Sequence, residues 1–375
     1  MDLRNCPNYR PGDERFNICN ASGHDPCHLL SVYHESIIFT LIFSTIIPLF
    51  AASTSTIFAG TELFLLVKVY IRLSSGLRKR YAFLGSRAIA IVTANLFIYI
   101  FFVLEVTGVD NYATYLLLVT LEQANLFHIG STFIGLTILL YIAITREVFY
   151  RTKLTLKFCY IYLLSSYVVL VGVSFVLYLY SIAPYFPDDS IVHCDYWNCQ
   201  KPMIILTVII IFGVYLLTGV LYCGIVIYLK RKPEYNLSSN SNAKALERLK
   251  YSITVFLFSA LGGLLYSITG FLDTSLLEKF VTTRPSICSS YIHGKAQITL
   301  ALLNGSTLFT IWLPIMIVDP IINIILDQNL SREFLTIWRS RCGCRKIIAE
   351  NRTFSRTEFT TIKRLSVISD DNNLG

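Results

Sequence analysis

Charge is what this sequence has least of. Only 15% of its 375 residues are Asp, Glu, Lys or Arg, whereas 54% are hydrophobic. A soluble domain usually carries about 25% charged residues, because its surface faces water. Here the hydrophobic residues form long runs separated by short charged clusters, a pattern typical of proteins that cross a membrane several times. The scarcity of charge therefore excludes an ordinary soluble protein.

Motifs for catalysis and metal binding are also missing. The chain has no His-Glu-x-x-His sequence, no Cys-x-x-Cys pair and no glycine-rich phosphate loop. Ser131 lies in a hydrophobic run, but no second run supplies the base that an intramembrane serine protease needs. The net charge is +8, yet the positive residues lie between hydrophobic runs rather than along one soluble face, so nucleic acid is not an expected partner. We expect no enzyme, no cofactor and no metal site.

The beginning of the chain lacks the mark of a cleaved signal peptide, which is a short hydrophobic stretch ending in small residues. The first 36 residues are instead polar and contain Pro7, Pro11 and Pro26. We expect residues 1–36 to form an extracellular, cysteine-containing segment, and the first span to act as its own insertion signal.

Seven hydrophobic runs are long enough to cross the bilayer as helices, since about 20 residues span its hydrocarbon core. None of them reads as a strand, so the expected fold is an all-α membrane protein, a seven-transmembrane helix bundle over residues 37–326. Pro48 in the first run predicts either a kink or an outer end that projects beyond the membrane. The expected spans are 42–69, 82–105, 113–145, 156–183, 203–229, 251–273 and 297–326.

The distribution of Lys and Arg predicts the orientation. Twenty-five of the 32 lie in the first, third and fifth loops with their flanks and in the C-terminal tail, and seven lie on the other side. Arg87 is counted here with the flank of the first loop. Because cytoplasmic loops are enriched in positive residues, we expect the N-terminus outside and the C-terminus in the cytoplasm of a multi-pass plasma-membrane protein.

Cysteines and glycosylation sequons agree with this orientation. Six of the ten cysteines fall on the predicted outer side, where disulfides persist, and the sequence does not choose among their pairings. Cys342 and Cys344 follow the last span, which suits palmitoylation; two ordinary cytosolic thiols are the alternative. Of five sequons, only that of Asn20 lies in an extracellular segment. The disulfide candidates are Cys6, Cys19, Cys27, Cys194, Cys199 and Cys288.

Ionisable residues at membrane depth are few, and they usually serve a function because they are costly there. Asn125 and His128 are three residues apart and share one face of the third span. A contact with a ligand is one interpretation of this pair, and a simple hydrogen bond between helices is the other. The ionisable residues in or at the ends of the spans are Glu62, Glu105, Glu122, His128, Asp273 and Asp319.

Three short motifs resemble those of the rhodopsin-like G-protein-coupled receptors. Asp319-Pro320-Ile-Ile-Asn323 in the seventh span is similar to the Asn/Asp-Pro-x-x-Tyr motif of that superfamily, with Asn in place of Tyr. Thr145-Arg146-Glu147 at the inner end of the third span resembles Asp-Arg-Tyr, and Ala94-Asn95-Leu96 in the second resembles Ala-Asp-Leu. The resemblance implies that these positions serve G-protein coupling or conformational switching.

The departures from the superfamily pattern resemble a narrower group. The third span has no Cys at its outer end, so the usual bridge to the second extracellular loop cannot form, and the sixth span lacks Trp-x-Pro. A seven-helix bundle that lacks these superfamily motifs resembles the nematode serpentine chemoreceptors. The resemblance covers about residues 40–345. It implies a short amphipathic helix along the membrane, residues 327–345, before a cytoplasmic Ser/Thr-rich tail, residues 346–375.

The function that the resemblance implies is that of a G-protein-coupled chemosensory receptor, with a sensory cilium as one location. An extracellular small molecule would bind in a mostly apolar pocket between the upper parts of spans three, five, six and seven, and a peptide is the alternative ligand. A heterotrimeric G protein would bind at the inner face, with membrane lipids along the basic flanks. A seven-span transporter or ligand-gated channel is the alternative function. The expected ligand contacts are Asn125, His128, Tyr266, Asp273 and Trp312; the expected coupling or switch residues are Arg146, Asn95, Asp319, Pro320, Asn323, Arg248 and Lys250.

Overall fold

The structure is a computed structural model. It describes residues 41–231 apart from four short gaps (74, 108–110, 184–188 and 194–195), scattered residues before 41, parts of 249–272, and residues 316–341. The chain divides into two units, Met1–Asn323 and Ile324–Gly375, each of which is described by itself. All regular structure in the described residues is helical.

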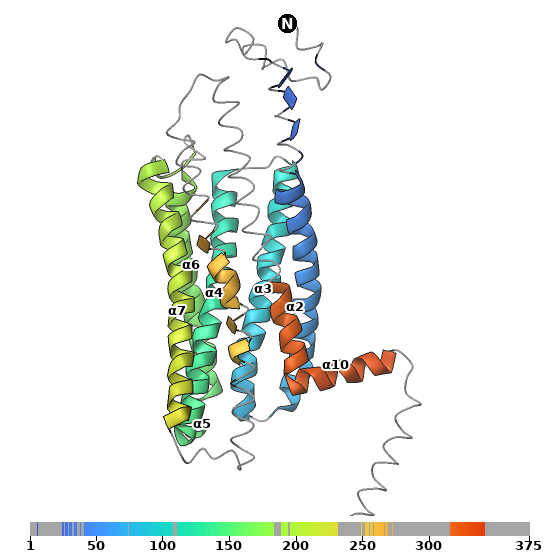
Figure 1. The fold of residues 1–375 in the computed structure, drawn as a ribbon, viewed down its shortest axis with the longest axis vertical. Coiled ribbons are helices and arrows are strands. Elements are labelled where there is room, and N and C mark those ends of the chain that lie inside the picture. The colour runs from blue at the N-terminus through green and yellow to red at the C-terminus, as the bar shows by residue number, and fades with distance from the viewer. Residues whose placement is uncertain are drawn as a thin grey trace, which may run out of the picture. The chain divides into compact units, whose positions relative to one another are not determined.

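Five helices of the first unit are long and apolar enough to cross a membrane. Figure 1 shows them side by side. They are α2 (Ile47–Arg72, preceded by the π-helix η3, Leu41–Ile46), α3 (Ser75–Thr107), α4 (Tyr112–Thr145), α6 (Leu156–Ser181) and α7 (Lys201–Arg231, preceded by the π-helix η5, Tyr196–Gln200). These helices match the first five expected spans, which is consistent with a helical membrane protein.

The remaining expected spans are described in part. Ser252–Leu265 and Met316–Leu326 are shorter apolar helices within the sixth and seventh runs. Residues 297–315 of the seventh run lie outside the described residues. The seven-span count and the orientation therefore stay predictions at this point.

Local sequence explains where several helices begin. Pro48 lies in the first turn of α2, directly after the π-helix η3, which is a position where proline is common. The side chain of Asn111 accepts a hydrogen bond from the Thr114 N–H at 2.8 Å and caps α4. Thr155 caps α6 in the same way through the Phe158 N–H, at 3.3 Å. The short helix α5, Glu147–Thr152, follows α4 directly.

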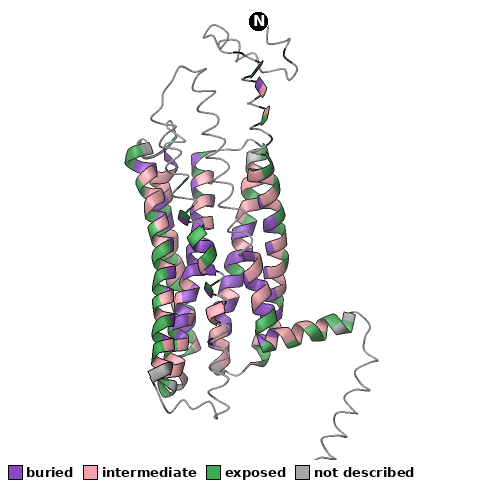
Figure 2. Ribbon diagram, in the orientation of Figure 1, coloured by how far each residue is buried: buried purple, intermediate pink, exposed green. Residues whose placement is uncertain are grey.

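The helix α4 lies at the centre of the five. It packs against α3, α6 and α7. In the 18-residue apolar stretch of α4, 56% of the residues are buried, whereas the corresponding share in α6 is 17%. The main cluster of buried apolar side chains accordingly includes Phe127, Ile129 and Phe133 of α4. Figure 2 shows buried positions gathered where helices face one another.

The outward faces of the same helices are apolar as well. Phe50, Ile57 and Leu164 are all more than two-thirds exposed. In water such exposed apolar faces would favour aggregation, whereas in a bilayer they contact hydrocarbon. Helices that are hydrophobic all round and only partly buried are those of a membrane bundle.

The described part of the second unit includes the amphipathic helix α10 (Gln328–Arg341). The Asp327 carboxylate accepts hydrogen bonds from the Asn329 and Leu330 N–H groups and caps its first turn. The rings of Phe334 and Trp338 stack with centroids 6.2 Å apart, which places both on one face of the helix. An apolar face of this kind on a polar helix suits the membrane interface.

Gly135 provides a test of the packing around α4. A Cβ at this position would collide with the Phe83 ring of α3 and lie 2.9 Å from Cε1 of Tyr162 on α6. We expect Gly135→Ala to lower the thermal unfolding temperature in detergent, because overpacking costs about 1–3 kcal/mol.

The matched control for this prediction is Gly60→Ala on α2, where a Cβ meets nothing within 4 Å. It should be neutral or stabilising, since Ala is the better helix former by about 1 kcal/mol. Equal unfolding temperatures for the two variants would contradict the close approach of α3, α4 and α6.

Candidate functional site

A buried ion pair joins α3 to the short helix Met316–Leu326. Arg87 is 1% exposed, and its Nε lies 2.9 Å from Oδ2 of Asp319, which is 7% exposed. Taking either charge out of water alone would cost several kcal/mol, so each charge makes the burial of the other tolerable. The pair therefore ties together two helices that are more than 200 residues apart in the sequence.

Two further polar residues extend this pair to α2. Arg87 Nη2 donates to Asn323 Oδ1 at 3.4 Å, and Asn323 Nδ2 donates to Glu62 Oε1 at 2.7 Å. Asp319 and Asn323 are four residues apart and so share one face of their helix. Glu62 on α2 is 1% exposed. We call Glu62, Arg87, Asp319 and Asn323 the buried polar network.

The helix α4 also contacts this network. The Arg87 guanidinium carbon lies 4.6 Å from the centre of the Phe133 ring, within the range of a cation–π interaction. Phe133 in turn meets Phe256 edge-on, with ring centroids 6.4 Å apart, and Phe256 meets Tyr222 of α7 at 5.1 Å. A chain of rings thus leads from Arg87 through α4 to α7.

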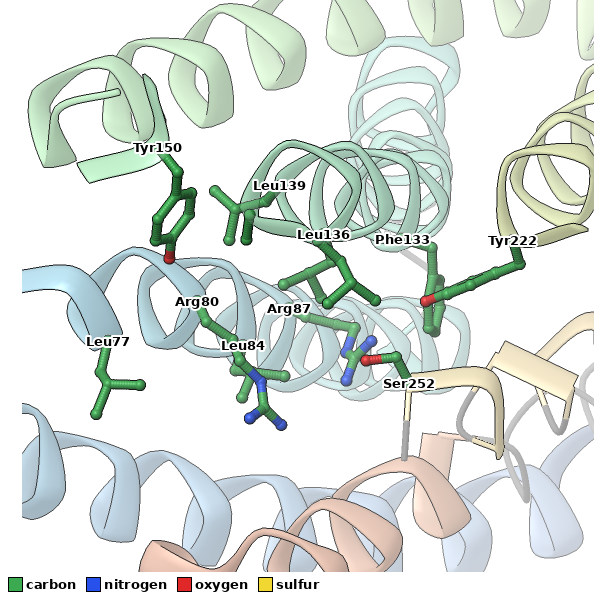
Figure 3. Close-up of a pocket in the computed structure, with 12 residues that line it drawn as sticks. Leu77, Arg80, Leu84, Arg87, Phe133, Leu136, Leu139, Tyr150, Tyr222 and Ser252 are labelled. Atoms are coloured by element: carbon green, nitrogen blue, oxygen red, sulfur yellow. The ribbon is translucent and has the colours of Figure 1, made fainter. Parts of the chain in front are cut away.

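A small cavity of about 70 Å³ lies beside Arg87 (Figure 3). Arg80, Leu84 and Arg87 of α3 line it together with Phe133 of α4, Tyr222 of α7 and Ser252. It extends to Tyr150 of α5, whose carbonyl accepts a hydrogen bond from Lys79 Nζ at 2.6 Å. Because Leu77 and Ala143 also line it, the cavity reaches the end of the bundle where α3 begins and α4 ends. Its size suits a few water molecules.

Two members of the network were not expected as site residues. Arg87 was counted with the flank of the first loop, whereas the structure buries it within α3, which begins at Ser75. Glu62 was expected at membrane depth, but nothing in the sequence pairs it with Asn323. The usable signal was one Arg and one Asp in different hydrophobic runs, since opposite charges at membrane depth tend to pair.

Asn125 and His128 lie on the side of α4 that meets α3 and α6. His128 Nε2 is 2.8 Å from Ser86 Oγ of α3, and the His128 ring meets Tyr167 of α6 edge-on, with centroids 5.3 Å apart. Both residues are at most 3% exposed and line a groove formed with α2, α3 and α6. The structure thus brings these two expected ligand contacts together, on the groove side of α4.

The other described coupling candidates lie apart from one another. Asn95 is fully buried, and its Nδ2 donates to Ser55 Oγ at 3.0 Å, which links α3 to α2. Arg146 is exposed where α4 ends, and its N–H donates to the Ile142 carbonyl at 2.9 Å. Pro320 is buried beside Asp319.

Several expected site residues lie outside the described residues. They are Tyr266, Asp273, Trp312, Arg248, Lys250, Asn20, Cys19, Cys194, Cys288, Cys342 and Cys344. Among the described cysteines, Cys6 and Cys27 form a disulfide with Cα atoms 5.3 Å apart, and Cys199 is also disulfide-bonded.

The sequence is similar to several Caenorhabditis elegans proteins over most of its length. It is 24% identical to "Putative G-protein coupled receptor-like protein B0244.6" over 88% of each chain. It is 22% identical to "Putative G-protein coupled receptor B0244.5" over 76% of this chain and 80% of the relative. With "Putative G-protein coupled receptor B0244.7" the identity is 26%, over 55% and 64%. No family model matches the sequence.

These similarities confirm the resemblance to nematode serpentine receptors. They support a receptor role, and the receptors concerned are not enzymes, in agreement with the lack of catalytic motifs in the sequence.

The Arg87–Asp319 pair can be tested by a double-mutant cycle. We expect Arg87→Met and Asp319→Leu each to destabilise the protein strongly, because each leaves a buried charge without its partner, at a cost of about 3–5 kcal/mol. The double variant should recover most of this loss, since it removes both charges.

Thermal unfolding in detergent would measure all three variants, with Ser55→Ala as the control for a neutral interhelical hydrogen bond. A double variant whose loss equals the sum of the two single losses would show that Arg87 and Asp319 do not interact.

Proposed function

We propose that this chain, a receptor-like protein of the nematode serpentine type, is a G-protein-coupled chemosensory receptor. The observation that carries the proposal is the buried polar network, which ties α2, α3 and Met316–Leu326 together beside a cavity at one end of the bundle. An ion pair between helices has two discrete arrangements, paired and separated, as a switch requires.

In the resting state Arg87 and Asp319 are paired and the neighbouring cavity is small. An agonist that binds more tightly to the separated state shifts the population toward it. Separation frees Met316–Leu326 to move away from α3, which enlarges the cavity so that a heterotrimeric G protein can insert. Arg146, Arg248 and Lys250 supply positive charge at that face, and Pro320 and Asn323 move with Asp319.

The proposed topology has seven spans, with the N-terminus outside and the C-terminus in the cytoplasm. Five long helices and two shorter apolar ones support the count. The Cys6–Cys27 disulfide supports an N-terminus in an oxidising compartment. The amphipathic α10 then lies along the inner leaflet, with palmitoyl groups on Cys342 and Cys344, in the plasma membrane of a sensory cell.

The switch predicts constitutive activity for Asp319→Asn. Loss of the carboxylate charge weakens the resting state, so ligand-independent nucleotide exchange on co-expressed G proteins should rise about fivefold or more per surface receptor. Tyr99→Phe, which removes the hydrogen bond from the Tyr99 hydroxyl group to Ser53 Oγ outside the network, should keep the basal rate.

The companion variant for this assay is Arg146→Ala, which should abolish nucleotide exchange both in the unmodified receptor and in Asp319→Asn. Basal exchange that is unchanged or lower in surface-expressed Asp319→Asn would overturn the switch. Ligand-evoked current in cells without G-protein signalling would favour a channel instead.

The topology predicts a glycan on Asn20 alone among the five sequons. Asn20→Gln should remove the glycosidase-sensitive shift in electrophoretic mobility, because only that sequon would enter the lumen. Asn236→Gln, in the third cytoplasmic loop, is the matched control and should leave the shift intact. A shift that persists in Asn20→Gln would contradict the proposed orientation.

A further inference from the structure

A groove of about 730 Å³ runs along α2, α3, α4 and α6. It is far larger than the cavity beside Arg87, and its volume falls within the range of small-molecule sites, about 300–1,000 Å³. Its walls are mostly apolar, with Tyr70 and Tyr160 near one end, where their hydroxyl groups lie 2.7 Å apart.

The groove opens on the side of the bundle. Val67, Ile89 and Leu164 on its rim are each more than half exposed, and they belong to three different candidate membrane spans. The exposed flank of a membrane-spanning helix faces hydrocarbon. An occupant therefore enters from the bilayer, which selects a molecule that dissolves in lipid.

The groove also holds hydrogen-bonding capacity that the protein does not use. Asn125 Nδ2 and His128 Nδ1 are buried and have no hydrogen-bond partner among the described residues. Ser86 occupies the other ring nitrogen of His128. Each of these atoms, from residues one helical turn apart, carries a desolvation cost of about 1–3 kcal/mol, which a bound polar group would relieve.

The chemistry of these atoms defines the polar group. An amide N–H donates, whereas the free ring nitrogen of His128 accepts or donates according to its tautomer, so a hydroxyl group satisfies both residues at once. No Asp, Glu, Lys or Arg is among the described residues that line the groove, which leaves a charged ligand without a counter-ion. The ligand is accordingly neutral.

The depth of the site separates such a ligand from the bulk lipids. His128 lies midway along the 34-residue helix α4. The hydroxyl of a bilayer sterol and the head of a phospholipid stay near the membrane surface, because they are solvated there. We propose that the groove binds a neutral, lipid-soluble alcohol of steroid size, whose hydroxyl group reaches Asn125 and His128.

This inference deepens the proposed function, because it gives the agonist a place and a chemical class. Binding can be measured without any G protein, so the two proposals can fail separately.

Gly85 offers a position from which a larger side chain would fill the groove. It lines the groove, and a Cβ built on it meets nothing within 4 Å. Gly85→Phe would therefore place a ring in the groove, whereas Gly85→Ala adds one methyl group. Gly172 on α6 is equally open but is not part of the groove, so Gly172→Phe is the matched control.

The experiment is photolabelling of the purified full chain in nanodiscs by a radiolabelled steroid alcohol that carries a diazirine. We expect labelling of the unmodified chain, Gly85→Ala and Gly172→Phe, and about tenfold less labelling of Gly85→Phe, because a filled site excludes the steroid. The unlabelled alcohol should compete better than the corresponding hydrocarbon, and Asn125→Leu should reduce that preference by about three- to tenfold.

Two results would overturn the proposal. One is equal labelling of Gly85→Phe and Gly172→Phe, which would place the steroid elsewhere. The other is equal competition by alcohol and hydrocarbon in the unmodified chain, which would show that the groove binds through apolar contacts alone and does not recognise the hydroxyl group. Labelling as expected without any effect on nucleotide exchange would keep the binding site and reject only its role as the agonist site.

Discussion

A buried charge in a membrane protein needs a partner of opposite charge, and this requirement organises the packing of the helices around Arg87. Arg87 is almost completely buried within α3, so its charge needs a partner, and the ion pair with Asp319 holds the helix Met316–Leu326 beside α3. Asn323 then meets Glu62 of α2, and the face of the guanidinium meets Phe133 of α4. One pair of charges thus sets the relative positions of four helices. Apolar contacts alone would not select one packing, because lipid tails are as apolar as the helix surfaces.

The groove and the polar network are physically close because they share one helix turn of α3. Ser86 contacts His128 at the groove, and the next residue, Arg87, contacts Asp319 in the network. On α4, His128 and Phe133 are five residues apart, about 7.5 Å along the axis. A rotation or shift of α3 against α4 therefore changes both contacts together, so the two proposed sites would be coupled through packed side chains.

Hydrophobic patterning predicted the long helices well and their ends less well. The run expected at 113–145 is α4, Tyr112–Thr145, almost residue for residue. The helix α3 begins at Ser75, seven residues before the expected boundary, because its first two turns are rich in Arg and Lys and lie outside any hydrophobic run. Hydropathy marks the hydrocarbon layer, whereas a helix ends where its backbone stops hydrogen bonding, and the two need not coincide.

Contacts between residues far apart in the chain could not be predicted from the sequence, for a different reason. Six outer cysteines allow 15 connectivities, and no local pattern singles out Cys6–Cys27. Asp319 and Asn323 were recognised through a motif, but their partners Arg87 and Glu62 follow from packing in three dimensions. The proximity of Asn125 and His128 was predictable from helical spacing, whereas the groove that they line depends on where α2 and α6 lie.

Because the groove opens toward the bilayer, the concentration that matters for binding is that of the ligand in the membrane. A molecule that arrives through the bilayer is sensed at its mole fraction in the membrane, and that fraction is set by how it partitions between water and lipid. Two compounds of equal intrinsic affinity would then differ in apparent potency by the ratio of their partition coefficients. Washing the cell surface would end the response slowly, because the lipid acts as a reservoir.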